Sequence, residues 1–97
     1  MHIKIPHKSS KSAAKQNIEK ALNEGRSQLA DKVEIHEEKW EGDTLNFDFT
    51  AQGQRITGTL EISDSDYVLD AKLPFMLRMF EGRIEKEIAS RVKELGA

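Results

Sequence analysis

Three histidines, His2, His7 and His36, are the residues of this chain best suited to metal binding or proton transfer. No two of them have the HxxxH or HExxH spacing that places two ligands on one helix face, so the sequence predicts no metal site. Asp64 and Asp66 resemble the start of a calcium loop, but the glycine and the distal glutamate of such a loop are missing. A hairpin turn explains both aspartates. His7, just after a proline, is expected to be a hydrogen-bonding loop residue.

Other catalytic patterns are also missing from the sequence. Glu37 and Glu38 are neighbours on a predicted strand, so their side chains point to opposite faces and cannot act together on one substrate. The serines and threonines lack a GxSxG nucleophile elbow, the six glycines are dispersed rather than gathered in a phosphate-binding loop, and cysteine is absent. The sequence therefore predicts no catalytic residue and no cofactor, and we expect that the protein is not an enzyme.

Length and charge narrow the class further. The 97 residues are expected to form a single domain, residues 1–97, and the net charge is −2. This charge argues against a nucleic-acid partner, because affinity for the phosphate backbone needs clustered Lys and Arg. No run reaches the roughly eighteen apolar residues of a membrane span. We therefore expect no transmembrane segment. The lack of cysteine fits a reducing compartment, so we also expect a cytoplasmic location.

The charge is unevenly distributed along the chain. Residues 1–18 contain four lysines and no acidic residue, whereas residues 31–48 contain seven acidic residues and two lysines. Opposite charges on two segments of one small domain favour contact between them. The sequence thus predicts that a basic helix packs near an acidic hairpin.

The first half of the chain predicts a strand and then a helix. In residues 1–5, Ile3 and Ile5 alternate with polar residues, which is the period of a half-buried strand, and Pro6 ends it. From residue 10 to about Ala30, apolar residues recur at helical spacing after a serine that can cap the helix. Because this apolar stripe is mostly small and includes Gly25, it suits a helix that lies close to a sheet.

Residues 33–73 change to a period of two and predict four strands. Their apolar residues alternate with Thr, Asp, Arg and Glu, so one face of the sheet is polar and both helices must cover the other face. We expect an antiparallel meander, with the strand of residues 1–5 beside its last strand. The expected strands are residues 33–40, 44–50, 55–62 and 67–73, with turns at 41–43, 52–53 and 64–66.

The last quarter of the chain, residues 73–95, predicts one long helix that begins at Pro74. Its core stripe is expected to contain Leu77, Phe80, Ile84, Ile88, Val92 and Leu95. Phe75 and Met79 fall on nearly the opposite side of the helix, Met76 lies at one edge, and Arg78 and Arg83 flank them. Apolar residues outside the core stripe predict either deep burial or an exposed binding patch. These five residues are therefore the candidate ligand- or partner-binding site.

Several of these features together resemble a known family. They include His7 ahead of the helix with Ala14, the segment Trp40-Glu41-Gly42-Asp43 followed by Leu45 and Phe47, Gly58 within a strand, and Val68-Leu69 leading to Leu73-Pro74, Ile84, Ile88 and Leu95. The chain resembles the polyhydroxyalkanoic acid system family, small bacterial proteins associated with the genetic region for polyester granules. The resemblance spans nearly the whole chain and brings no active site with it. His7 is its one polar position without an obvious structural task.

These observations lead to one expected fold and several functions. The fold class is α+β, with order β-α-β-β-β-β-α and both helices on one face of an antiparallel sheet, similar to a small helix-grip fold. The resemblance implies a non-enzymatic accessory protein of polyester storage that binds the granule surface, lipid or a granule protein through the apolar patch. The alternatives are a soluble carrier of a hydroxyacyl or fatty-acyl ligand held between sheet and helix, and a homodimeric structural module. An enzyme would need a polar group inside such a cavity, with His7 as the candidate.

Overall fold

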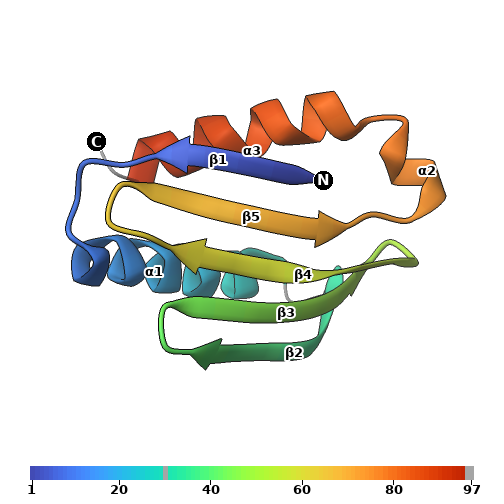
Figure 1. Cartoon of the computed structure of the whole chain (residues 1–97). Helices are drawn as coiled ribbons and strands as arrows, with labels where there is room; N and C mark the ends of the chain where they lie inside the picture. Colours follow the sequence, from blue (N-terminus) through green and yellow to red (C-terminus); the bar gives the residue numbers. More distant parts are fainter. Residues whose placement is uncertain (30, 96–97) are drawn as a thin grey trace.

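The chain folds into an open sheet with helices on one of its faces. The computed structural model describes residues 1–29 and 31–95, and Figure 1 shows their arrangement. Within these residues the elements are β1 (His2–Pro6), α1 (Lys11–Leu29), β2 (Val33–Glu41), β3 (Thr44–Ala51), β4 (Gln54–Ile62), β5 (Asp66–Lys72), α2 (Phe75–Arg78) and α3 (Glu81–Leu95). The predicted helix over residues 10–30 corresponds to α1, and Ala30 lies outside the described residues.

The sheet has five strands in the order β1-β5-β4-β3-β2, and each pair of neighbours is antiparallel. Strands β2 to β5 form a meander, and β1 lies beside β5 with Ile3 opposite Leu69. Since β1 and β2 are the two edges, α1 connects opposite edges of the sheet (Figure 1). These observations confirm the predicted α+β class, the order of the elements and the position of the first strand beside the last.

The core joins both long helices to the same face of the sheet. Ala14 of α1 is completely buried, with an exposed fraction of 0 %, and the Tyr67 hydroxyl donates a hydrogen bond to its backbone oxygen at 3.5 Å. Small residues at this position let the helix backbone approach the strands closely, as the small apolar stripe predicted. Around this contact gather Ile5, Ile18 and Ile62, with Leu22, Trp40, Ile88, Ala89, Val92 and Leu95 at the margin.

The predicted contact between basic helix and acidic hairpin is confirmed. Lys11 Nζ lies 3.5 Å from a carboxylate oxygen of Asp43 in the β2–β3 turn. Lys15 Nζ lies 4.8 Å from the ring centroid of Trp40 and donates to the backbone oxygen of Gly42 at 3.2 Å. An ammonium over an indole face is attracted by the negative ring face, so Lys15 holds Trp40 against the margin of the core.

Strand β2 does not alternate regularly along its length. Its register with β3 shifts between Ile35 and Glu37, so that Ile35 lies opposite Phe49 whereas Glu38 lies opposite Phe47. Such a bulge inserts one extra residue into one strand and reverses the alternation beyond it. Ile35 and Glu38 therefore both face the helices, which strict alternation from Val33 would not predict for Glu38.

The predicted single helix over residues 73–95 is divided in two. Helix α2 ends at Arg78, Phe80 N–H donates to the Leu77 oxygen at 3.0 Å, and α3 begins at Glu81. A straight helix of that length would extend beyond the sheet, whereas the turn at Met79 and Phe80 directs α3 back along β1 (Figure 1). Phe80, expected in the core stripe, is 53 % exposed because it lies in this turn.

Two glycines have opposite surroundings. A Cβ atom on Gly58 would lie 2.1 Å from the backbone oxygen of Asp70 and 2.9 Å from the Phe47 ring, so only glycine lets these strands and this ring approach. A Cβ atom on Gly25, inside α1, would have no atom of the described residues within 4 Å. A side chain at Gly25 therefore enters open space.

This difference can be measured with two alanine variants. Gly58→Ala should lower the free energy of unfolding by about 3 kcal/mol, because the backbone of β5 cannot move without breaking its pairing. Gly25→Ala should raise the free energy of unfolding by up to about 1 kcal/mol, because alanine is the better helix former. Urea unfolding followed by circular dichroism measures both, and equal effects of the two variants would contradict these surroundings.

Alkaline pH should destabilise the fold through Tyr67. Burial raises the pKa of Tyr67 above its ordinary value of 10.0, although a hydrogen bond with Asn17 opposes part of this shift. The folded state therefore binds the phenolic proton more tightly than the unfolded state, so this stabilisation is complete below about pH 10 and is lost as the pH rises further. Raising the pH from about 9 to about 11 should lower the free energy of unfolding less in Tyr67→Phe than in the wild type. A parallel loss in both proteins would contradict the prediction.

Candidate functional site

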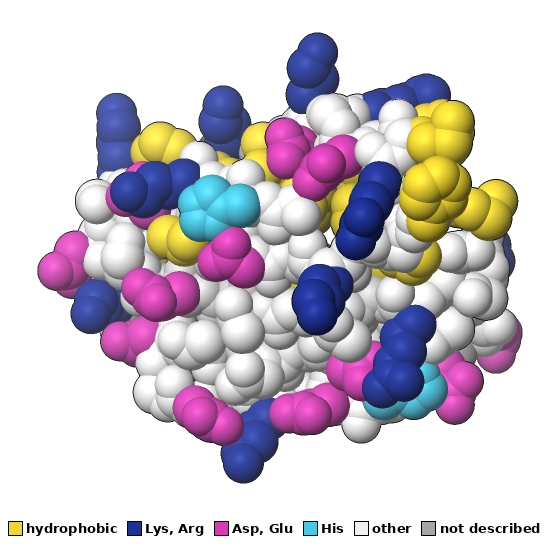
Figure 2. Space-filling view, turned by 45° about the vertical axis from the view of Figure 1, so that its right-hand side comes forward, with side chains coloured by type: hydrophobic (Ala, Val, Ile, Leu, Met, Phe, Trp, Pro, Cys, Tyr) yellow, Lys and Arg dark blue, Asp and Glu magenta, His cyan; other side chains and the backbone are white. Residues whose placement is uncertain are grey.

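The residues that the sequence singled out are exposed at one end of the molecule. The exposed fractions are 78 % for Phe75, 65 % for Met76, 77 % for Met79 and 53 % for Phe80. We call these four side chains the α2 patch. Figure 2 shows hydrophobic side chains gathered over this end of the molecule, with Lys or Arg side chains beside them. Of the two alternatives that the sequence left open, deep burial or an exposed patch, the structure has the exposed patch.

The local fold explains why these side chains face solvent. Leu73, just before α2, is buried at the end of β5, and Arg78 Nε donates to the Leu73 backbone oxygen at 3.3 Å. This bond closes the short helix onto the end of the strand and leaves its apolar side chains pointing outward. Leu77 is half-buried, and Arg83 is exposed in the first turn of α3. Both predicted arginines thus belong to the same end of the molecule as the α2 patch.

An apolar groove of about 740 Å³ lies between the inner face of the sheet and the two long helices. Its volume is within the range of about 300–1,000 Å³ that is typical of small-molecule sites. The α1 side is lined by Ala21, Leu22, Gly25, Arg26 and Leu29, and the α3 side by Ile84 and Ile88. The sheet contributes Ile35, Leu45, Phe47, Phe49, Ile56, Leu60, Leu69 and Leu73. The carrier hypothesis needs a cavity of this size.

The groove adjoins the α2 patch along the chain. Leu73 lines the groove and is separated from Phe75 only by Pro74, while Ile84 lines it four residues after Phe80. Strand β5 ends at this side of the sheet, and α2 projects beyond it (Figure 1). The described residues therefore present two apolar surfaces at the same end of the fold.

One ion pair interrupts the apolar lining of the groove. Arg26 Nη2 of α1 lies 2.7 Å from Glu38 Oε2 of β2, and both residues line the groove. The Glu38 side chain is 22 % exposed and that of Arg26 is 46 % exposed. The bulge in β2 turns Glu38 toward the helix, and the helical stripe that contains Leu22 brings Arg26 to the same side. This arrangement can bind the polar head of a ligand whose chain lies in the groove.

Sequence reasoning missed Arg26, Glu38 and the role of Gly25. The sequence held a partial signal for Gly25, because a glycine inside a predicted helix marks a position without a side chain. The bulge was not visible, because residues 34–39 contain only one apolar residue, Ile35, by which to judge the alternation. Without the bulge, strict alternation from Val33 assigns Glu38 to the solvent face.

His7 is held in a structural role outside the groove. Its Nε2 lies 2.8 Å from the backbone oxygen of Ser63, and its Nδ1 accepts a hydrogen bond from the Ser9 N–H at 3.2 Å. The ring also lies 4.9 Å from the Tyr67 ring. Both ring nitrogens are thus occupied, and His7 is not among the residues that line the groove. It joins the end of β1 to the β4–β5 turn, which confirms the expected role of a hydrogen-bonding loop residue.

The other two histidines lie on opposite edges of the sheet. His2 of β1 pairs with Asp70, and His36 Nε2 of β2 lies 2.8 Å from the Thr50 hydroxyl. Within residues 1–29 and 31–95, no group of three or more His, Cys, Asp or Glu side chains could hold a metal ion. The helices of this part of the chain include none that is long and apolar enough to cross a membrane.

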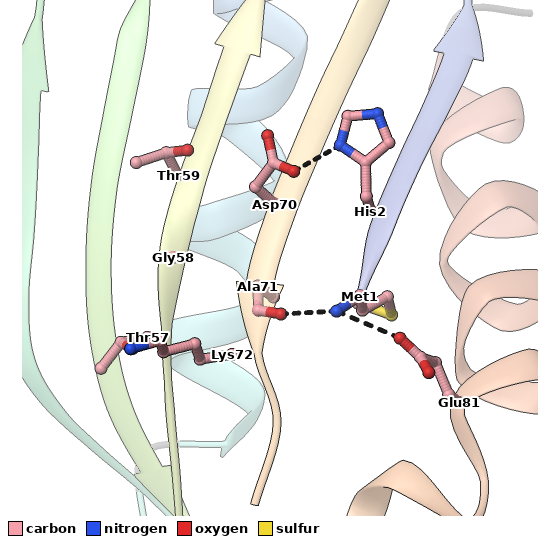
Figure 3. A pocket seen from close by; sticks show the side chains of 9 residues that line it. All are labelled: Met1, His2, Thr57, Gly58, Thr59, Asp70, Ala71, Lys72 and Glu81. Atoms are coloured by element: carbon pink, nitrogen blue, oxygen red, sulfur yellow. Dashed lines mark hydrogen bonds and ion pairs between the residues drawn. The ribbon is translucent and has the colours of Figure 1, made fainter.

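A second, shallower hollow of about 500 Å³ lies beside the start of β1, on the sheet face turned away from α1 (Figure 3). The amino group of Met1 donates to the Ala71 oxygen at 2.8 Å and lies 3.1 Å from Glu81 Oε1. His2 points toward Asp70 in the same view. Because these polar groups already bind one another, the hollow offers fewer free contacts to a ligand than the groove does.

Comparison with known proteins identifies the family of the chain. Residues 1–95 match the family described as "Putative polyhydroxyalkanoic acid system protein". No curated protein and no solved structure matches the chain. The match extends over both surfaces at the α2 end, over the core and over His7, and it agrees with the resemblance seen in the sequence. The chain therefore belongs to this family, which connects it with the polyhydroxyalkanoic acid system.

Proposed function

We propose that the protein is a non-enzymatic accessory component of polyester storage that binds the granule surface through the α2 patch. The observation that supports this function best is the exposure of four large apolar side chains on one short helix and the turn after it. A surface of this kind is typical of an interaction site, because fully burying one such side chain contributes about 1.5–3 kcal/mol. Methionine side chains also adapt to irregular surfaces such as that of a polymer.

The surroundings of the patch suit the same function. Arg78 and Arg83 flank the patch, so a surface that carries carboxylate end groups would gain favourable charge contacts beside the apolar ones. The proposal places the protein in the cytoplasm together with the polyester. A lipid layer and a granule-bound protein are the other surfaces that this patch could contact.

Co-sedimentation with purified polyester granules tests the proposal. The variant with Phe75→Ser and Met79→Ser should bind granules at least about tenfold more weakly, because two apolar anchors are lost. Leu29→Ser is the control for the loss of one exposed apolar helix side chain outside the patch, since Leu29 is 45 % exposed and lines the groove instead. Unchanged binding by a double variant with a native circular dichroism spectrum would overturn the proposal.

The same double variant separates granule binding from self-association. If the patch were the seam of a homodimer, sedimentation velocity at several concentrations would detect a dimer of the wild type that the double variant does not form. Granule binding that persists while the dimer is lost would assign the patch to dimerisation. A protein that is monomeric at all concentrations and binds granules through the patch supports the proposal.

A second candidate function is a carrier for a hydroxyacyl or fatty-acyl chain. The groove supports it, because about 740 Å³ of mainly apolar space exceeds the volume of roughly 300 Å³ that such a chain needs. The aromatic rings of Phe47 and Phe49, with centroids 6.0 Å apart, contribute to its sheet side. An acyl chain bound there would cover apolar surface that the two helices leave open.

Filling the groove tests the carrier function. Gly25→Leu introduces a side chain into open space, so the fold should persist while binding of the methyl ester of hydroxydecanoic acid falls at least about tenfold. Gly82→Leu is the matched control, because Gly82 also lies in a helix with an open Cβ position but does not line the groove. Titration calorimetry measures both, and equal binding by the two variants would contradict the carrier function.

A further inference from the structure

We propose that the Arg26–Glu38 ion pair makes the groove selective for a neutral hydroxyacyl ester over a free carboxylic acid. This inference rests on the carrier function and names the chemical class of its ligand. It starts from the observation that Arg26 and Glu38 bring a donor and an acceptor together within an otherwise mainly apolar lining. The chain of the ligand is then bound by the apolar residues, and its head by these two side chains.

The charges around the head position disfavour an anion. Arg26 is compensated by Glu38 at 2.7 Å, so its positive charge is already neutralised within the groove. A ligand carboxylate would therefore have to displace Glu38 from Arg26 and lie beside the displaced Glu38 carboxylate. The displaced Glu38 carboxylate, whose side chain is only 22 % exposed, would lose its counter-charge while lying beside the bound anion, which opposes anion binding.

A neutral head can bind without breaking the ion pair. A guanidinium carries five N–H donors, and a carboxylate has several acceptor positions, so one contact between Arg26 and Glu38 leaves both with free capacity. An ester carbonyl can accept a hydrogen bond from Arg26, while a nearby hydroxyl donates one to Glu38. A head that contains both groups is a hydroxyacyl ester. Hydrogen bonds to charged groups are stronger than those between neutral groups, so this contact contributes to both affinity and specificity.

These contacts also indicate which kind of molecule binds in the groove. A second copy of this chain would need an apolar segment with a matching neutral polar group, whereas one acyl chain with an ester head supplies both in a single small molecule. The position of Glu38 depends on the bulge in β2, and the position of Arg26 depends on α1, so both are fixed by backbone that is well separated from the α2 patch along the chain. Granule binding through the α2 patch and head selection in the groove can therefore be tested independently.

Titration of the full-length protein with two probes tests the inference. The methyl ester of hydroxydecanoic acid should bind at least about tenfold more tightly than the hydroxydecanoate anion. In Glu38→Gln the guanidinium loses its counter-charge, so the preference should shift by about tenfold or more toward the anion. Asp48→Asn is the matched control, because it removes the carboxylate 2.6 Å from Arg55, a pair that does not line the groove, and should leave the preference unchanged.

The possible results distinguish a failure of the selectivity from a failure of the carrier function. Equal or tighter binding of the anion by the wild type overturns the selectivity, and so does an unchanged preference in folded Glu38→Gln. If the wild type binds neither probe, the carrier function fails and the selectivity fails with it. Both also fail if the only effect of Gly25→Leu is to dissociate a dimer of two copies of this chain. Binding of both probes that Gly25→Leu abolishes, without a preference between them, leaves the carrier function and rejects the role of the ion pair.

Discussion

The fold depends on one close contact, in which the first half of α1 and the second half of α3 meet over Tyr67. Ala14 is small enough for the α1 backbone to accept a hydrogen bond from the tyrosine, and Ile88 and Val92 pack at the margin of the same cluster. From this contact the two helices diverge, because α1 runs toward β2 whereas α3 begins beyond the end of β5 (Figure 1). The tight packing at one end of the sheet and the open groove at the other are therefore consequences of the same geometry.

Sequence reasoning predicted most of the fold, because it depends on periodicity. Alternation of apolar and polar residues defined the strands, and a single polar face required both helices on the other side. The break after Arg78 was not predicted, since neither proline nor glycine stands at Met79 or Phe80. The break comes instead from tertiary packing, which returns α3 to the sheet. Local sequence preference carries little information about such a constraint.

The candidate site, too, was only partly predictable from the sequence. Phe75, Met76 and Met79 could be selected because they depart from a helical stripe, which is a property of the sequence alone, and they are exposed in the structure. Arg26 and Glu38 could not be selected, because their proximity depends on the bulge in β2 and on how α1 crosses the sheet. Residues that contact each other across two elements are determined by packing, and a single sequence gives no measure of it.

The edges of the sheet also have a consequence for solubility. β2 is an edge strand, and an edge strand with free backbone groups can recruit another chain and begin aggregation. In this protein the edge carries exposed Glu34, Glu37, Lys39 and Glu41 and the bulge, while Pro6 removes one backbone donor from the opposite edge. Charge, irregular twist and proline all oppose the growth of an intermolecular sheet. Backbone pairing with another chain is therefore disfavoured at both edges, whereas the exposed apolar surface of the α2 patch consists of side chains.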